Sequence, residues 1–205
     1  MDQHPLDRIR LLSARFHELQ GLRVALTGAC IALVVGGYLV FSPQPTDNGS
    51  MVALAASFVP VVPGVWLLNR YYATNFGLQV GSPPKHPRYL NLFFVFYFLL
   101  SLLLNAAIPS IPAGAPTALT AALISVWVAI RDWPHRAHYL VVTAAVVIGF
   151  AVSASGAGLL PANLTVGTIF VLLGASFVLV GVVDHLLLVK LMKEARQTQT
   201  SIPTA

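Results

Sequence analysis

Asp184 and His185 stand side by side in the last long apolar stretch of this sequence. Ionisable side chains at membrane depth are energetically costly, so each is a candidate functional residue by default. Because imidazole titrates near neutral pH, the pair predicts a proton-sensitive or ligand-binding site near the end of a membrane helix. The alternative is a polar anchor at the membrane boundary, in which the pair contacts an arginine. The candidate arginines are Arg23, Arg70 and Arg131.

A second polar cluster lies between Arg131 and His138, where the sequence reads Arg-Asp-Trp-Pro-His-Arg-Ala-His. His135 and His138 could supply two metal ligands from one helical turn. However, Pro134 interrupts that turn, and no cysteine or carboxylate-rich partner completes a zinc site. We therefore interpret the segment as a solvated, positively charged turn without a metal. Haem would need histidines deep on two spans, and only His185 is a candidate, so haem is not expected and the cofactor stays unknown.

Other catalytic motifs are missing from the sequence. There is no glycine-rich phosphate loop, no nucleotide motif and no pair of intramembrane carboxylates. Ion paths and catalysis usually need several convergent polar groups, and few ionisable residues fall within the apolar stretches. Cys30 is the single cysteine, which excludes an internal disulfide and a cysteine-based metal cluster. We therefore expect a protein without enzymatic activity.

Composition predicts the elements that hold these residues. Of the 205 residues, 57% are hydrophobic and only 9% are charged, whereas soluble domains contain about 25% charged residues. Most of the surface must therefore face lipid, where one helical span needs about 20 apolar residues. Six apolar stretches qualify as spans: 24–40, 51–68, 90–108, 117–130, 138–154 and 166–189. We predict an all-α membrane protein that folds as a bundle of six transmembrane helices.

The charges predict how this bundle is oriented. All 12 Lys and Arg residues lie on one side of the six-span arrangement, and the loops 42–50, 109–116 and 155–165 contain none of them. The positive-inside rule assigns the basic side to the cytoplasm, so both termini are expected there. The compact chain and simple charge pattern favour a bacterial inner membrane. The net charge of +5 sits in clusters beside the spans, which argues against a nucleic-acid partner.

Two short segments flank the predicted spans. Residues 1–23 carry apolar side chains at intervals of three or four, with charged residues on other faces. The apolar positions are Leu6, Ile9, Leu12, Phe16 and Leu19. This pattern predicts an amphipathic helix that lies on the inner leaflet or docks on a partner subunit. We divide the chain into this helix, a membrane domain at 24–190 and a cytoplasmic tail at 191–205.

Small residues predict the closest helix contacts, because membrane helices approach one another where side chains are small. The stripes are Gly28, Ala32 and Gly36 in the first span, and Gly167, Gly174 and Gly181 in the sixth. They could contact each other or a second copy of the protein. Pro60 and Pro63 lie inside the second span and predict a bend there.

The basic side offers candidate contacts with protein or anionic lipid. These residues are Lys85, His86, Arg88, Arg131 and Arg136. We therefore expect a non-enzymatic membrane subunit, or a binding or assembly protein, whose partners are the lipid bilayer and other membrane subunits or a second copy of itself. The alternative is a homodimeric small transporter or channel with its polar site at Asp184 and His185.

Overall fold

A computed structural model of the chain describes residues 21–76, 115–131, 133, 136–154 and 165–200, and every regular element among them is helical. The elements are α2 (Leu22–Phe41), α3 (Asp47–Phe76), α5 (Ala115–Arg131), the 3-10 helix η1 (Ala137–Tyr139), α6 (Leu140–Ala154) and α7 (Thr165–Thr200). The predicted all-α fold is confirmed for these residues. Most of the predicted amphipathic helix at 1–23 and the predicted span at 90–108 lie outside the described residues.

Among the described residues, three helices are long and apolar enough to cross a membrane: Leu22–Phe41, Asn48–Asn75 and Val166–Glu194. The helices α5 and α6 are also apolar but shorter, with 17 and 15 residues. Many large apolar side chains remain exposed on all five helices, among them Phe41, Trp66, Trp127, Ile148 and Leu186. Water would disfavour so much exposed apolar surface, whereas lipid accepts it. The protein is therefore a helical membrane protein.

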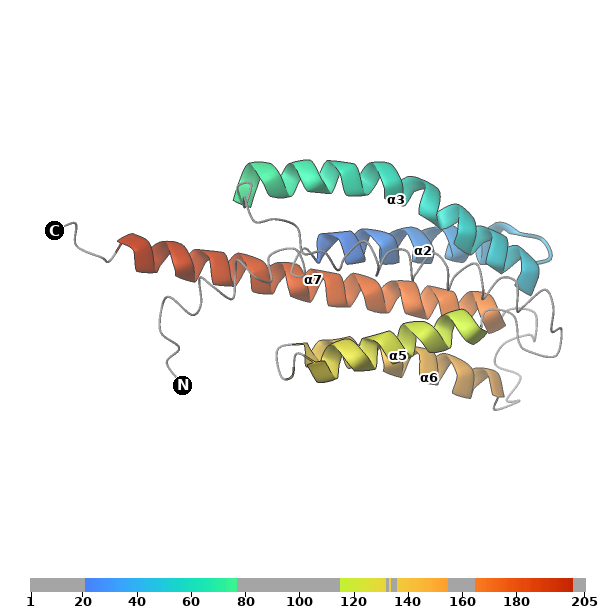
Figure 1. The fold of residues 1–205 in the computed structure, drawn as a ribbon. Helices are drawn as coiled ribbons and strands as arrows, with labels where there is room; N and C mark the ends of the chain where they lie inside the picture. Colours follow the sequence, from blue (N-terminus) through green and yellow to red (C-terminus); the bar gives the residue numbers. More distant parts are fainter. Residues whose placement is uncertain (1–20, 77–114, 132, 134–135, 155–164, 201–205) are drawn as a thin grey trace.

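The helix α7 occupies the centre of the bundle (Figure 1). On one side α2 packs against it and α3 covers α2; on the other side α6 packs against it and α5 lies beside α6. The buried core joins these helices through side chains such as Val35 of α2, Val142 of α6 and Phe170 of α7. The described helices thus form two antiparallel pairs, one on each side of α7.

The two predicted glycine stripes face each other across the α2–α7 contact. A Cβ atom placed on Gly174 would lie 2.7 Å from the Gly28 carbonyl oxygen and 2.8 Å from the Ala32 amide nitrogen. A Cβ on Gly181 would meet the backbone of Gly21 and Ala25. Such close approach needs glycine, because any larger residue would push the helices apart. In the structure, the glycine stripes of α2 and α7 therefore contact each other within one chain.

Only part of each stripe takes part in this close contact. Gly36 lies at its margin, because a Cβ there would be 3.7 Å from the nearest Val171 side-chain atom, an ordinary packing distance. Gly167 faces a different neighbourhood, namely the side chains of Leu39 and Ser50. The backbones of α2 and α7 therefore approach most closely at the beginning and the middle of α2.

Two helices extend well beyond their predicted spans. The helix α3 runs to Phe76 and contains Pro60 and Pro63, and it is visibly bent in Figure 1, as the prolines predict. Both prolines are exposed, so they line no cavity among the described helices. The helix α7 continues through Thr200, and its C-terminal end projects past the other helices. The segment predicted as a tail therefore begins as a helix.

Candidate functional site

The polar residues of the candidate site meet at the end of the bundle where α2 begins, α3 ends and η1 leads into α6. There α7 presents Asp184 and His185 in adjacent positions. Consecutive residues of an α-helix point about 100° apart, so the two side chains face different neighbours. Asp184 contacts η1, and His185 contacts α3.

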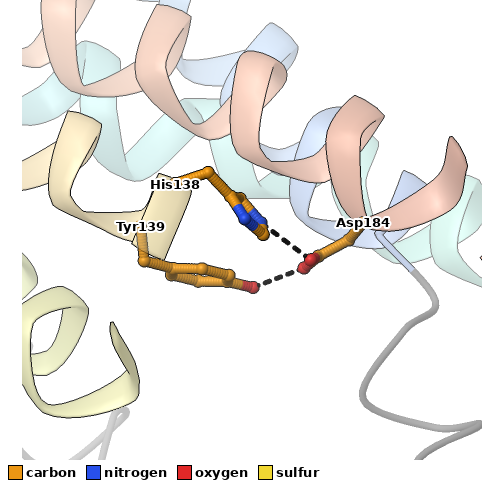
Figure 2. A network of polar contacts seen from close by, with 3 residues as sticks. All are labelled: His138, Tyr139 and Asp184. Carbon is orange, nitrogen blue, oxygen red and sulfur yellow. Dashed lines mark hydrogen bonds and ion pairs between the residues drawn. The ribbon is translucent and has the colours of Figure 1, made fainter. Parts of the chain in front are cut away.

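Asp184 is fully buried, with a relative exposure of 0%. Its Oδ1 lies 2.9 Å from Nε2 of His138, and its Oδ2 accepts a hydrogen bond of 2.7 Å from the hydroxyl of Tyr139 (Figure 2). The turn is closed by the Tyr139 N–H, which donates to the Arg136 carbonyl at 3.0 Å. This short 3-10 helix therefore directs two consecutive side chains toward one carboxylate.

The donors compensate for the burial of the carboxylate. An unpaired charge in a low-dielectric interior is strongly disfavoured, and hydrogen bonds to a charged oxygen are stronger than those between neutral groups. When Asp184 is ionised it can only accept, so Nε2 of His138 carries the proton of their shared bond. The His138 side chain keeps 18% exposure, whereas the Asp184 side chain has none. The network thus gives both carboxylate oxygens a donor from one short helical turn.

His185 forms a second set of contacts on the other side of α7. Its Nδ1 lies 3.3 Å from the hydroxyl of Tyr72, a side chain with only 1% exposure. The same hydroxyl accepts a 3.2 Å hydrogen bond from the Leu22 backbone N–H. Leu22 is the first residue of α2, and N–H groups in the first turn lack partners within their own helix. Tyr72 therefore caps α2 and links it to α3 and α7.

The structure gives Asp184 partners different from the arginines considered in the sequence. Arg23 instead donates from Nη2 to Oδ1 of Asn69, and Arg131 lies with its Cζ 5.2 Å from the centre of the Trp127 ring. Asp184 and His185 are therefore joined to the bundle through histidine and tyrosine side chains.

The interpretation of residues 131–138 as a solvated turn is wrong in part. His138 bonds the buried carboxylate, and Arg136 is only 8% exposed, with its Cζ 5.8 Å from the Tyr139 ring centre. His135 lies outside the described residues. The sequence contained a signal for this contact. His138 begins the predicted fifth span and Asp184 lies in the last turns of the predicted sixth span, so both are expected near the same membrane boundary.

The predicted contact residues of the basic side are only partly described. Arg131 is exposed at the end of α5, as expected for such a contact, whereas Arg136 is buried. Lys85, His86 and Arg88 lie outside the described residues.

Within the described part of the chain, no group of three His, Cys, Asp or Glu side chains could hold a metal ion. The described site is thus a carboxylate, two imidazoles and two phenols that connect α7 with α2, α3 and η1. No protein-family model, curated protein or solved structure shows significant similarity to this chain.

Proposed function

We propose that this protein is a non-enzymatic inner-membrane subunit or assembly protein whose buried polar residues hold its helices in register. The observation that carries the proposal is the engagement of Asp184, which is fully buried and bonded at both oxygens by its own chain. A carboxylate that binds a transported ion must offer its oxygens to that ion. Here a cation could reach them only after the bonds to η1 are broken.

The charge distribution supports an interaction role at one end of the bundle. Arg23, Arg70, Arg131 and Lys190 lie in helix turns at the same end as Asp184, by the antiparallel pairing of their helices. By the positive-inside rule this end faces the cytoplasm, where the basic side chains can meet other proteins or anionic headgroups.

The helix directions also support the six-span topology that this proposal assumes. The helix α3 ends at the basic end of the bundle, whereas α5 begins at the opposite end (Figure 1). The described residues that precede and follow 77–114, Phe76 and Ala115, therefore lie at opposite ends of the bundle. A span at 90–108 would make this connection, and both termini would then be cytoplasmic.

Native mass spectrometry after gentle detergent extraction from the natural host tests the proposal. We expect other membrane proteins to accompany the chain in a fixed ratio. Asp184→Asn should weaken that association by disturbing the helix arrangement. The same chemical change at Glu194→Gln, further along α7, is the matched control and should leave the association intact.

The transporter or channel alternative makes a different prediction. A homodimer that emerges alone and supports a pH-dependent flux in proteoliposomes would overturn the subunit proposal, provided that His185→Ala abolishes the flux. The chain would then use Asp184 and His185 as a conduction site rather than as a structural connection.

A further inference from the structure

Arg23 occupies an unusual position between α2 and α3 at the basic end of the bundle. Its side chain is half-buried, and its Nη2 donates to Oδ1 of Asn69. Its Nε is buried and makes no hydrogen bond within the described structure. A guanidinium has five N–H donors, so the contact with Asn69 uses only a small part of its hydrogen-bonding capacity.

Among the described residues, no neighbouring acid balances the charge of Arg23. The amide of Asn69 is neutral, and the described part of the chain places no carboxylate within ion-pair distance of Arg23. Asp184 is a buried acid at the same end of the bundle, and its carboxylate is bonded to His138 and Tyr139. A cation at the membrane boundary without a counter-ion is energetically costly. Arg23 is therefore a position where an external anion would lower the energy.

The part of α3 around Asn69 carries side chains suited to the headgroup layer. Asn69 is exposed, and Trp66 lies one helical turn before it with 62% exposure. Arg70 and Tyr71 are exposed in the same turn of α3. Tryptophan and tyrosine prefer the level of lipid headgroups, where phosphate groups lie.

We propose that Arg23 and Asn69 form a binding site for the phosphate group of an anionic phospholipid between α2 and α3. A guanidinium matches the geometry of phosphate and can donate two parallel hydrogen bonds to it. Asn69 accepts from Arg23 through its oxygen, which leaves its amide nitrogen to donate to the same anion. The exposed tryptophan one turn before Asn69 favours a lipid headgroup over free phosphate.

Thermal unfolding and native mass spectrometry of the full chain in detergent test this site with three probes: phosphatidylglycerol, phosphatidylcholine and inorganic phosphate. We expect phosphatidylglycerol to raise the Tm most and to remain bound in the spectrometer. Arg23→Gln should weaken its binding about tenfold or more, the effect of losing hydrogen bonds from a charged group. Asn69→Ala keeps the charge and should weaken binding to a smaller extent.

Lys193→Gln is the matched control, because it removes one positive charge at an exposed residue further along α7 from Asp184. Equal weakening by Lys193→Gln and Arg23→Gln would overturn the site, since binding would then follow net charge alone. Equal binding of phosphatidylglycerol to the wild type and to both Arg23→Gln and Asn69→Ala would also overturn it. Stabilisation by inorganic phosphate alone would refute the lipid headgroup as the ligand.

Discussion

At the scale of single residues, Asp184 contributes most to the described arrangement, because its buried carboxylate accepts from two donors on another helical segment. Its neighbour His185 meets Tyr72 on the opposite side of α7. One helical turn thus forms polar bonds to both helix pairs. The strength of each bond reflects its desolvated surroundings, where a lost partner leaves a charge or dipole without water.

Tyr139→Phe removes one of the two donors to Asp184 without changing the ring. We expect the free energy of unfolding to fall by about 1–3 kcal/mol, the usual effect of leaving a buried acceptor with one partner fewer. Thermal unfolding in detergent, followed by tryptophan fluorescence, measures the change. Tyr71→Phe alters an exposed tyrosine in the same way and should shift the Tm much less. Equal shifts would mean that the Tyr139 hydroxyl does not stabilise the carboxylate.

At the scale of elements, the α2–α7 contact depends on glycines whose backbones touch. Gly174 and Gly28 each lie too close to the other helix to accept a Cβ without movement of the backbone. Gly37 belongs to the same helix as Gly28, yet a Cβ there would meet nothing within 4 Å. The same substitution therefore has opposite consequences at two positions of α2.

Gly28→Ala should separate α2 from α7 and lower the free energy of unfolding by about 1–3 kcal/mol, as overpacking does. Gly37→Ala should be neutral or stabilising by up to about 1 kcal/mol, because alanine favours helix over glycine. Thermal unfolding of both variants in one detergent compares them directly. Similar losses at the two positions would show that helix propensity and the α2–α7 contact do not govern the result.

The sequence predicted the helices and their closest faces better than it predicted the polar contacts. Hydropathy located the described helices, and the interval of seven between Gly167, Gly174 and Gly181 identified a packed face of α7. The bond from His138 to Asp184 depends on how α6 and α7 rotate about their axes. A rotation of about 100° exchanges the environments of Asp184 and His185, and hydropathy alone does not specify that rotation.

At the scale of the whole molecule, the two helix pairs contact each other mainly through α7. The pair α2 and α3 lies on one side and the pair α5 and α6 on the other (Figure 1). The basic residues of the described helices gather at the end where Asp184 lies. The positive-inside rule predicts that this end is cytoplasmic, and labelling can measure it.

Single cysteines at the two ends of α3 test this orientation in a Cys30→Ser background. Gln44→Cys and Asn75→Cys replace exposed residues close to opposite ends of the helix. In spheroplasts, a membrane-impermeant maleimide should label position 44 directly and position 75 only after the membrane is permeabilised. Labelling in the reverse order would invert the proposed topology, and labelling of both without permeabilisation would contradict a span between them.

The adjacent placement of Asp184 and His185 has a mechanical consequence. Because neighbouring residues of one rigid helix bond to opposite helix pairs, α7 cannot slide or turn against one pair without straining its bonds to the other. The two halves of the bundle should therefore open in a single cooperative step rather than one after the other. A force on the projecting end of α7, or a ligand bound there, would consequently act on both helix pairs at the same time.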